Sequence, residues 1–214
     1  MSRRRRVAVL FSGRGSNMAA LIAAAARPGF PAEIVRAVTN VPDAPGLALA
    51  ARAGIPSVVL DHRAHGRDRA AHEAAIDAAL TGADVDLVCL AGYMRLLTPF
   101  LVDRWEGRMI NVHPSLLPAF PGLHTHARAL AAGVRLHGCT VHYVTRTMDE
   151  GPIIAQAAVP VLPGDTETTL ADRVLAQEHV LYPAALHLVA GGAAAPAPAA
   201  AALLNPLPPA PALT

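Results

Sequence analysis

The sequence predicts an α/β protein: a single Rossmann-like, doubly wound domain whose mostly parallel sheet has an antiparallel portion in its C-terminal half. Two features of the 214-residue chain support this fold. In the first half, short apolar runs alternate with helical stretches, which is the pattern of β-loop-α units with right-handed crossovers. In the second half, two strand-like runs are joined by a connection too short for a parallel crossover, so they must be antiparallel.

The first half supplies the parallel strands. Its first apolar run, residues 7–11, has no polar side chain, as expected of a strand buried on both faces. Turn or helix-ending residues such as Gly54 separate the elements. We expect strands at 7–11, 34–40, 57–60 and 85–91, and helices at 18–26, 44–53 and 67–80.

The second half supplies one further strand, the antiparallel pair and a long final helix. Asp165 or Thr166 is the expected N-cap of that helix. The expected elements are strands at 109–113, 139–145 and 153–161, a Pro- and His-rich loop at 114–126, a turn at 148–152 and a helix at 168–190.

From Gly191 onward the composition changes to Gly, Ala and Pro. Such a segment offers few helix or ladder hydrogen bonds. We therefore expect one α/β domain at residues 1–190, followed by a largely irregular tail at 191–214.

Charge and hydropathy exclude several classes of protein. The net charge is +2, and without the run Arg3–Arg6 acidic residues are in slight excess, which is no footprint for nucleic acid. We expect that run to be a solvated, frayed terminus. No apolar run reaches the roughly 18 residues of a membrane span, and the first strand begins too early for a signal peptide. These features predict a soluble, cytoplasmic protein without nucleic-acid or membrane partners.

The segment Ser12–Asn17 lies between the first strand and the first helix. Free backbone N–H groups and the positive end of the helix dipole form an anion site there, and Gly13 and Gly15 let a ligand come close. Position 18 is Met and no Gly-Lys-Ser/Thr follows, which argues against a dinucleotide fingerprint and a Walker A loop. A single phosphate on a sugar fits better, and a plain glycine-rich turn is the alternative.

Asn111 and His113 are two residues apart at the end of a predicted strand, so their side chains point to the same face. A carboxamide and an imidazole side by side can both donate to one developing oxyanion. If Asp149 folds back onto His113, it would keep the imidazole protonated and oriented. These groups suit acyl-type transfer without a covalent nucleophile. Alternatively, His113 is a structural histidine and Asp149 a turn residue before Gly151.

Two further groups of residues could belong to a site. Residues 93–97 combine an apolar wall with Arg95, which suits a flat heteroaromatic ligand with an acidic tail; a routine strand exit is the alternative. Neither Cys89 nor Cys139 belongs to a C-x-x-C pair, so both are expected to be buried and reduced. Five histidines could suggest a metal, but no nearby Cys or carboxylate completes a ligand set, and none is expected: His113, His124, His126, His137 and His142.

Taken in order, these motifs resemble phosphoribosylglycinamide formyltransferase, the folate-dependent family of purine synthesis, from about residue 7 to about residue 188. The order and spacing of six motifs carry the resemblance. They are Ser12-Gly13-x-Gly15-Ser16-Asn17, Ala91-Gly92-Tyr93-Met94-Arg95, Asn111-Val112-His113-Pro114-Ser115-Leu116-Leu117-Pro118, Pro121-Gly122-Leu123-His124-Thr125-His126, Asp149-x-Gly151-Pro152 and Gln177-Glu178-His179-x-x-Tyr182-Pro183.

The resemblance implies formyl transfer from 10-formyltetrahydrofolate, as co-substrate, to the amine of glycinamide ribonucleotide, with small-molecule substrates and no metal, by a monomer or homodimer. It implies three groups of site residues. The catalytic residues would be Asn111, His113 and Asp149; those for the ribonucleotide Gly15, Ser16, Asn17 and Glu178; and those for the folate Arg69, Met94, Arg95, Leu96, Leu97, Asn111, Val144 and Asp149.

Rival functions and departures from the family remain. Formyltetrahydrofolate deformylase shares the Asn-x-His and Asp pattern but usually carries a regulatory domain before the first strand, and methionyl-tRNA formyltransferase would need a tRNA domain beyond residue 191. A folate- or nucleotide-binding module without catalysis is the third alternative. Arg146 and Thr147 replace an acidic pair of some members, and Leu175 replaces a polar contact, which puts ligand affinity in question.

Overall fold

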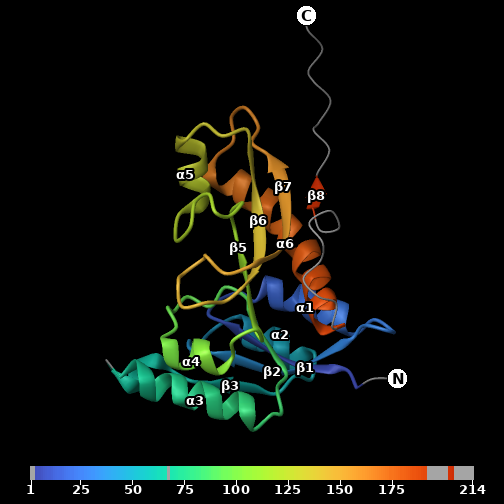
Figure 1. Ribbon diagram of the computed structural model, residues 1–214, viewed down its shortest axis with the longest axis vertical. Helices are drawn as coiled ribbons and strands as arrows, with labels where there is room; N and C mark the ends of the chain where they lie inside the picture. Colours follow the sequence, from blue (N-terminus) through green and yellow to red (C-terminus); the bar gives the residue numbers. More distant parts are fainter. Residues whose placement is uncertain (1–2, 67, 192–201, 205–214) are drawn as a thin grey trace, which may run out of the picture.

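The computed structural model describes residues 3–66, 68–191 and 202–204, and in this part of the chain the strands form one sheet (Figure 1). The sheet has eight strands in the order β3-β2-β1-β4-β5-β6-β7-β8. The first five in this order are parallel to one another, β6 is antiparallel to both neighbours, and β8 is parallel to β7. The strands are β1 (Arg5–Phe11), β2 (Ala32–Thr39), β3 (Ser57–Val59), β4 (Leu87–Leu90), β5 (Met109–His113), β6 (Leu136–Tyr143), β7 (Ile153–Pro160) and β8 (Ala202–Leu204).

Helices cover both faces of this sheet, so the predicted doubly wound α/β class is confirmed. On β1, Val7 and Val9 belong to one core and Ala8 and Leu10 to the other, and all four are fully buried. Side chains of α1, α2, α5 and α6 complete the first core, and side chains of α3 and α4 the second. The helices are α1 (Ser16–Ala25), α2 (Gly46–Arg52), α3 (Arg69–Thr81), α4 (Pro99–Arg104), α5 (Thr125–Ala131) and α6 (Glu167–Ala190), with a 3₁₀ turn η1 at His62–His65.

Two short helices, α4 and α5, are absent from the sequence prediction. With six and seven residues they span at most two turns, too short for a helical repeat of apolar residues to stand out. Pro99 at the first position of α4 was the local signal that a helix begins there. The long helix was predicted well, because Thr166 caps it and forms a capping box with Thr169.

The expectation that Arg3–Arg6 is a frayed terminus is wrong. β1 begins at Arg5, and Arg3 donates to Asp86 at 2.8 Å from its terminal nitrogen. Arg4 donates to the carbonyl of Ala32. These partners are distant in sequence, so the run makes tertiary hydrogen bonds that its charge alone did not predict.

A short part of the largely irregular tail predicted at 191–214 is a strand in the structure. Ala202–Leu204 form β8, which pairs with Gln156–Ala158 of β7. The unpaired N–H and C=O groups at the edge of a sheet can accept an added strand. The other residues of the predicted tail after Gly191 lie outside the described residues.

The topology places the candidate site. β1 pairs with β2 on one side and with β4 on the other. The strand order therefore reverses between β1 and β4: successive strands are added on one side of β1 up to β3, and on its other side from β4 onward. Ligands of open α/β sheets bind in the crevice at such a point, outside the carboxyl ends of the strands. Near these strand ends the fully buried Tyr182 of α6 donates to the carbonyl of Leu90, the last residue of β4, and to that of Ile110, just before Asn111 in β5, at 3.1 Å each. α6 therefore fixes the strand ends that carry the site.

Candidate active site

The predicted anion loop lies at the N-terminus of α1, where Gly15 is the N-cap with a left-handed backbone (φ 75°). The loop packs closely on α2: a Cβ on Gly15 would come within 3.1 Å of the Gly46 Cα, and one on Gly46 within 2.5 Å of the Phe11 ring. The first turn of α1 holds no acidic residue. Its free N–H groups and dipole therefore face the crevice without an acidic side chain of the helix's own first turn.

Asn17 and Glu178 are 161 residues apart in the sequence and meet beside this loop. The Asn17 Nδ2 donates to the Glu178 Oε2 at 2.6 Å, and both residues are buried. Burial raises the pKa of the Glu178 carboxyl, and the hydrogen bond from Asn17 offsets part of the rise. The buried Oδ1 of Asn17 has no partner among the described residues, so it can accept from a ligand.

His113, at the end of β5, is buried between two acceptors. Its Nδ1 lies 3.4 Å from the Asp149 Oδ2, and its Nε2 lies 3.1 Å from the Phe120 carbonyl oxygen. A carbonyl can only accept, so Nε2 carries a proton, and a proton on Nδ1 would satisfy the carboxylate as well. The geometry thus provides both acceptors that an imidazolium needs. Phe120 itself has a strained positive φ of 54°.

Asp149 folds back onto His113, the arrangement on which the sequence hypothesis was conditional. It has a left-handed backbone (φ 60°), and its Oδ2 also accepts from the Gly122 N–H at 2.8 Å. The carboxyl group is only 9% exposed. Its second oxygen, Oδ1, lies 3.8 Å from the His142 Nε2. One carboxylate therefore connects the predicted catalytic histidine to the Pro- and His-rich loop.

The sequence analysis missed the role of His142, which it considered only as a metal ligand. His142 is the cross-strand partner of Asn111, and its Nε2 lies 3.3 Å from the Asn111 Nδ2. Its Nδ1 donates to the Tyr143 carbonyl at 2.9 Å, so Nε2 is left to accept from the amide. Burial lowers the pKa of His142, which keeps it neutral for this task.

Most of the predicted folate residues lie in two segments, residues 94–97 and the stretch from Val144 to Asp149, near the carboxyl ends of the parallel strands. Met94 and Leu96 are 66% and 58% exposed, although their apolar side chains favour burial. Arg69, from the start of α3, donates to the Leu96 carbonyl at 3.2 Å, and the Met94 N–H donates to the Ser12 Oγ at 2.8 Å. The structure therefore joins Arg69 to this segment and joins the segment to the anion loop.

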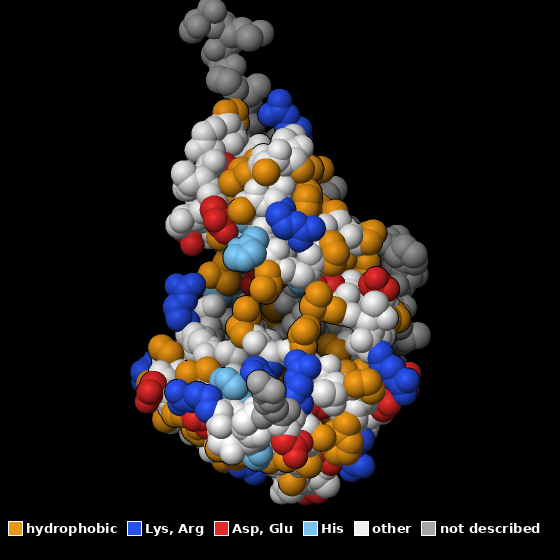
Figure 2. Space-filling model, turned by 90° about the vertical axis from the view of Figure 1, so that its left-hand side faces the viewer, with side chains coloured by type: hydrophobic (Ala, Val, Ile, Leu, Met, Phe, Trp, Pro, Cys, Tyr) orange, Lys and Arg blue, Asp and Glu red, His pale blue; other side chains and the backbone are white. Residues whose placement is uncertain are grey.

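Three other predicted folate residues are partly buried. Leu97 and Val144 pack against the second core, and Arg95, two residues before Leu97, is half-buried. Figure 2 shows the side on which α4, α5 and the β6–β7 connection lie in Figure 1. That side is hollowed between the two halves of the molecule, with hydrophobic side chains around the hollow.

The clustered histidines do not form a metal centre within the described ranges, where no group of three or more His, Cys, Asp or Glu could hold an ion. The Nε2 of His137 instead lies 3.2 Å from the Nδ1 of His126. Burial and the neighbouring His126 lower the pKa of His137 to about 4. Within the same ranges, no helix has the length and apolar character to cross a membrane.

The fold and the site define a class: a doubly wound α/β protein with an amide, an imidazole and a carboxylate at the strand ends, next to an anion loop. The chain belongs to the formyl transferase family, whose model matches residues 5–186.

The chain is similar to several proteins with informative names. It is 42% identical to a phosphoribosylglycinamide formyltransferase of Escherichia coli, over 87% of both chains. It is 57% identical to a crystal structure of the enzyme of that name from Brucella melitensis, with a TM-score of 0.84, and covers 100% of that chain and 91% of its own. A trifunctional purine biosynthetic protein adenosine-3 of Gallus gallus is 50% identical over 188 residues, which are 88% of this chain but only 19% of that longer protein.

Proposed function

We propose that the protein transfers the formyl group of 10-formyltetrahydrofolate to the amine of glycinamide ribonucleotide, a step of de novo purine biosynthesis. One observation carries the proposal: Asn111, His113, Asp149 and His142 form one cluster beside the anion loop, joined by the Asn111–His142 hydrogen bond and by the contacts of the Asp149 carboxylate with both imidazoles at 3.4 and 3.8 Å. The names of the similar bacterial proteins and membership of the formyl transferase family support the same reaction.

The ribonucleotide binds at the anion loop in this proposal. The N–H groups of Gly15, Ser16 and Asn17 meet its phosphate at the N-terminus of α1. Glu178, held by Asn17, accepts from hydroxyls of the ribose. The folate lies across the neighbouring edge, against residues 94–97 and Val144, with Arg69 and Arg95 near its acidic end.

The amine of the ribonucleotide attacks the formyl carbon directly. A new C–N bond forms, the carbonyl electrons move to the formyl oxygen, and the bond from carbon to the folate nitrogen breaks as the carbonyl re-forms. The amine loses a proton and the folate nitrogen gains one, through a water that Asp149 orders. The chain's own residues supply the donors and the proton path, and no covalent nucleophile takes part.

The oxyanion needs donors that are partly engaged in the unliganded protein. Asn111 uses one N–H on His142 and keeps a second for the formyl oxygen. His113 donates from Nε2 to the Phe120 carbonyl, so this bond must exchange for one to the oxyanion. Removal of one such donor typically costs on the order of 100- to 1,000-fold in rate.

Three further expectations go with this function. Residues 1–190 form the catalytic domain, the partners are small molecules, and the protein acts in the cytoplasm as a monomer or homodimer. The residues present require no metal for the steps above. Gel filtration tests the oligomeric state, and activity after dialysis against a chelator tests whether a metal is needed.

The test is a spectrophotometric assay with 10-formyl-5,8-dideazafolate, with and without glycinamide ribonucleotide. Turnover that requires the ribonucleotide and falls at least about 100-fold in His113→Ala supports the transferase. The matched control is His187→Ala, because His187 is exposed and packs on Phe30 before the start of β2, away from the strand ends that carry the site.

Other outcomes select the rival functions. Turnover of the folate without any acceptor would make the protein a deformylase. Absence of turnover in both assays, with retained binding of the folate analogue, would make it a binding module and would overturn the proposal.

A further inference from the structure

The short helix α4 is anchored to α3 at its N-terminal end. Glu73 of α3 is 3% exposed, and its carboxylate accepts from the Thr98 N–H at 2.7 Å and from the Thr98 hydroxyl at 2.5 Å. Thr98 is the N-cap of α4 and directly follows the predicted folate segment 94–97. A charge-assisted pair of bonds to one buried carboxylate is a strong anchor.

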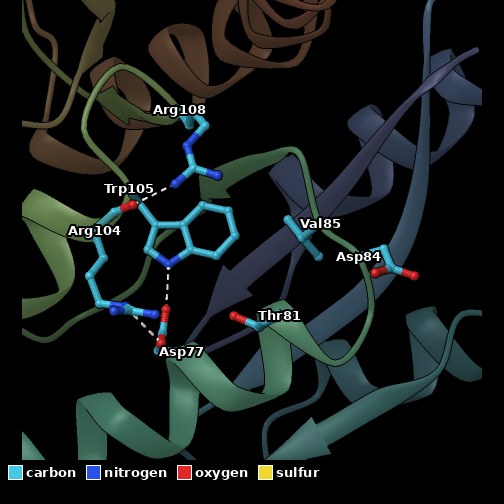
Figure 3. Close-up of a pocket in the computed structure, with 7 residues that line it drawn as sticks. All are labelled: Asp77, Thr81, Asp84, Val85, Arg104, Trp105 and Arg108. Atoms are coloured by element: carbon cyan, nitrogen blue, oxygen red, sulfur yellow. Dashed lines mark hydrogen bonds and ion pairs between the residues drawn. The ribbon is translucent and has the colours of Figure 1, made fainter.

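The other end of α4 is anchored to α3 as well (Figure 3). Asp77 accepts from the Trp105 Nε1 at 3.1 Å and pairs with the Arg104 Nε at 2.8 Å. Arg108 lies over the Trp105 ring, 4.5 Å from its centre. With both ends fixed, α4 is a rigid base for any group that its remaining side chains hold.

Asp103 of α4 holds the segment that enters the β6–β7 connection. Arg146 donates from Nε to one oxygen of Asp103 at 2.7 Å and from its terminal nitrogen to the other at 2.6 Å. This two-bond fork matches the planar guanidinium to the carboxylate. Arg146 lowers the pKa of the Asp103 carboxyl, in agreement with a formed ion pair.

Residues 145–148 have few other polar ties among the described residues. Thr145 donates within the segment, to the Thr147 carbonyl at 3.0 Å. The flanks are held separately, by the Val144 N–H on the Met109 carbonyl and by the contacts of Asp149. A cavity of about 480 Å³ lies between α4 and this segment, lined by Val102 and Glu106 and by residues 144–147.

We propose that the Arg146–Asp103 pair positions the 144–148 wall of the formyl-donor pocket, so that it sets affinity for the donor without taking part in the chemistry. This inference rests on the proposed function for the identity of the donor. It assigns a use to Arg146, which departs from the acidic residue expected at this place: an acid there would face Asp103 with like charge, whereas Arg146 fastens the wall to α4. The pair lines the same cavity as Val144, one of the predicted folate residues.

Steady-state kinetics and calorimetry on the full chain test this role. We expect Arg146→Ala and Asp103→Ala each to raise the KM for the formyl donor about two- to fivefold, as suits one exposed but well-formed pair. The kcat and the KM for glycinamide ribonucleotide should stay unchanged. The double variant should be no worse than either single one, and the exchanged pair Asp103→Arg with Arg146→Asp should recover donor affinity.

The control is Arg3→Ala, which removes an ion pair of similar exposure on Asp86, outside the site. It should leave the donor KM unchanged. Equal rises of both KM values, additive losses in the double variant, or no change at all would overturn the positioning role. Titration calorimetry with 10-formyl-5,8-dideazafolate keeps the two proposals separate, because the wild-type protein and the variants can differ in analogue affinity even if no formyl transfer occurs.

Discussion

Asp149→Asn is the sharpest test of the site, because the amide keeps the shape of the side chain. Its oxygen can still accept from the Gly122 N–H, a bond of 2.8 Å in the wild-type protein. What the variant loses is the negative charge 3.4 Å from the His113 Nδ1. The change therefore isolates the effect of the carboxylate on the imidazolium.

The geometry gives the size of this effect. At an effective dielectric constant of about 20, unit charges 3.4 Å apart attract each other by about 5 kcal/mol. Because about 1.4 kcal/mol corresponds to a tenfold change in rate, loss of the pair should lower kcat on the order of 1,000-fold. The KM for the ribonucleotide should change little, since Asn17 and Glu178 are untouched.

The assay is the ribonucleotide-dependent turnover of the dideaza donor, measured together with the thermal unfolding of each variant. Asp165→Asn is the matched control, because Asp165 is also a buried carboxylate, paired with Arg173 at 2.7 Å, but lies before α6. The control should lose stability and keep kcat. If Asp149→Asn keeps more than about a tenth of the wild-type kcat, the carboxylate–imidazolium argument is refuted.

The remaining predictions concern buried groups. Glu178→Gln should weaken ribonucleotide binding, seen as a raised KM. Burial raises the folded-state pKa of Glu178, so its stabilising contribution is present at low pH and lost as the pH rises through that pKa. In urea unfolding, the free energy of unfolding of the variant should therefore increase relative to that of the wild type from about pH 4 to about pH 8. An unchanged difference would contradict this. Tyr182→Phe removes the donor to the carbonyls of Leu90 in β4 and Ile110 in β5 and should lower the free energy of unfolding by about 1–3 kcal/mol; a loss below about 0.5 kcal/mol would count against the anchor. Cys89 and Cys139 are fully buried, and burial raises the pKa of Cys89 to about 12, so neither should react with a thiol reagent at neutral pH until urea unfolds the chain.

Much of the fold could be predicted because local rules decide it. Residues Val7–Phe11 are apolar at every position, which indicates a strand buried on both faces, and the structure confirms it. Thr166, one of the two expected N-caps, marked the start of α6. The prediction failed at α4 and α5, which are too short for a helical repeat to stand out, and at the Arg3–Arg6 run, because its partners are remote in sequence.

The candidate site divides in the same way. Alternation along β5 was enough to place Asn111 and His113 on one face, and the motif order pointed to Asp149 as their partner. The pairing of His142 with Asn111 and the occupation of His113 by the Phe120 carbonyl could not be foreseen. The first depends on the register of β5 against β6 and the second on the path of the loop after β5, and neither can be read from the sequence.

The amino-acid sequence by itself determined the α/β class, the glycine-containing loop after β1 and the candidate reacting groups, because side-chain period and turn chemistry act between near neighbours. Only the tertiary structure decided which donors are free and which groups hold the pocket walls. The bonds concerned join residues 161 apart for Asn17 and Glu178, 43 for Arg146 and Asp103, and 31 for Asn111 and His142. Contacts at such separations form only when packing of the whole core fixes the strands and helices relative to one another.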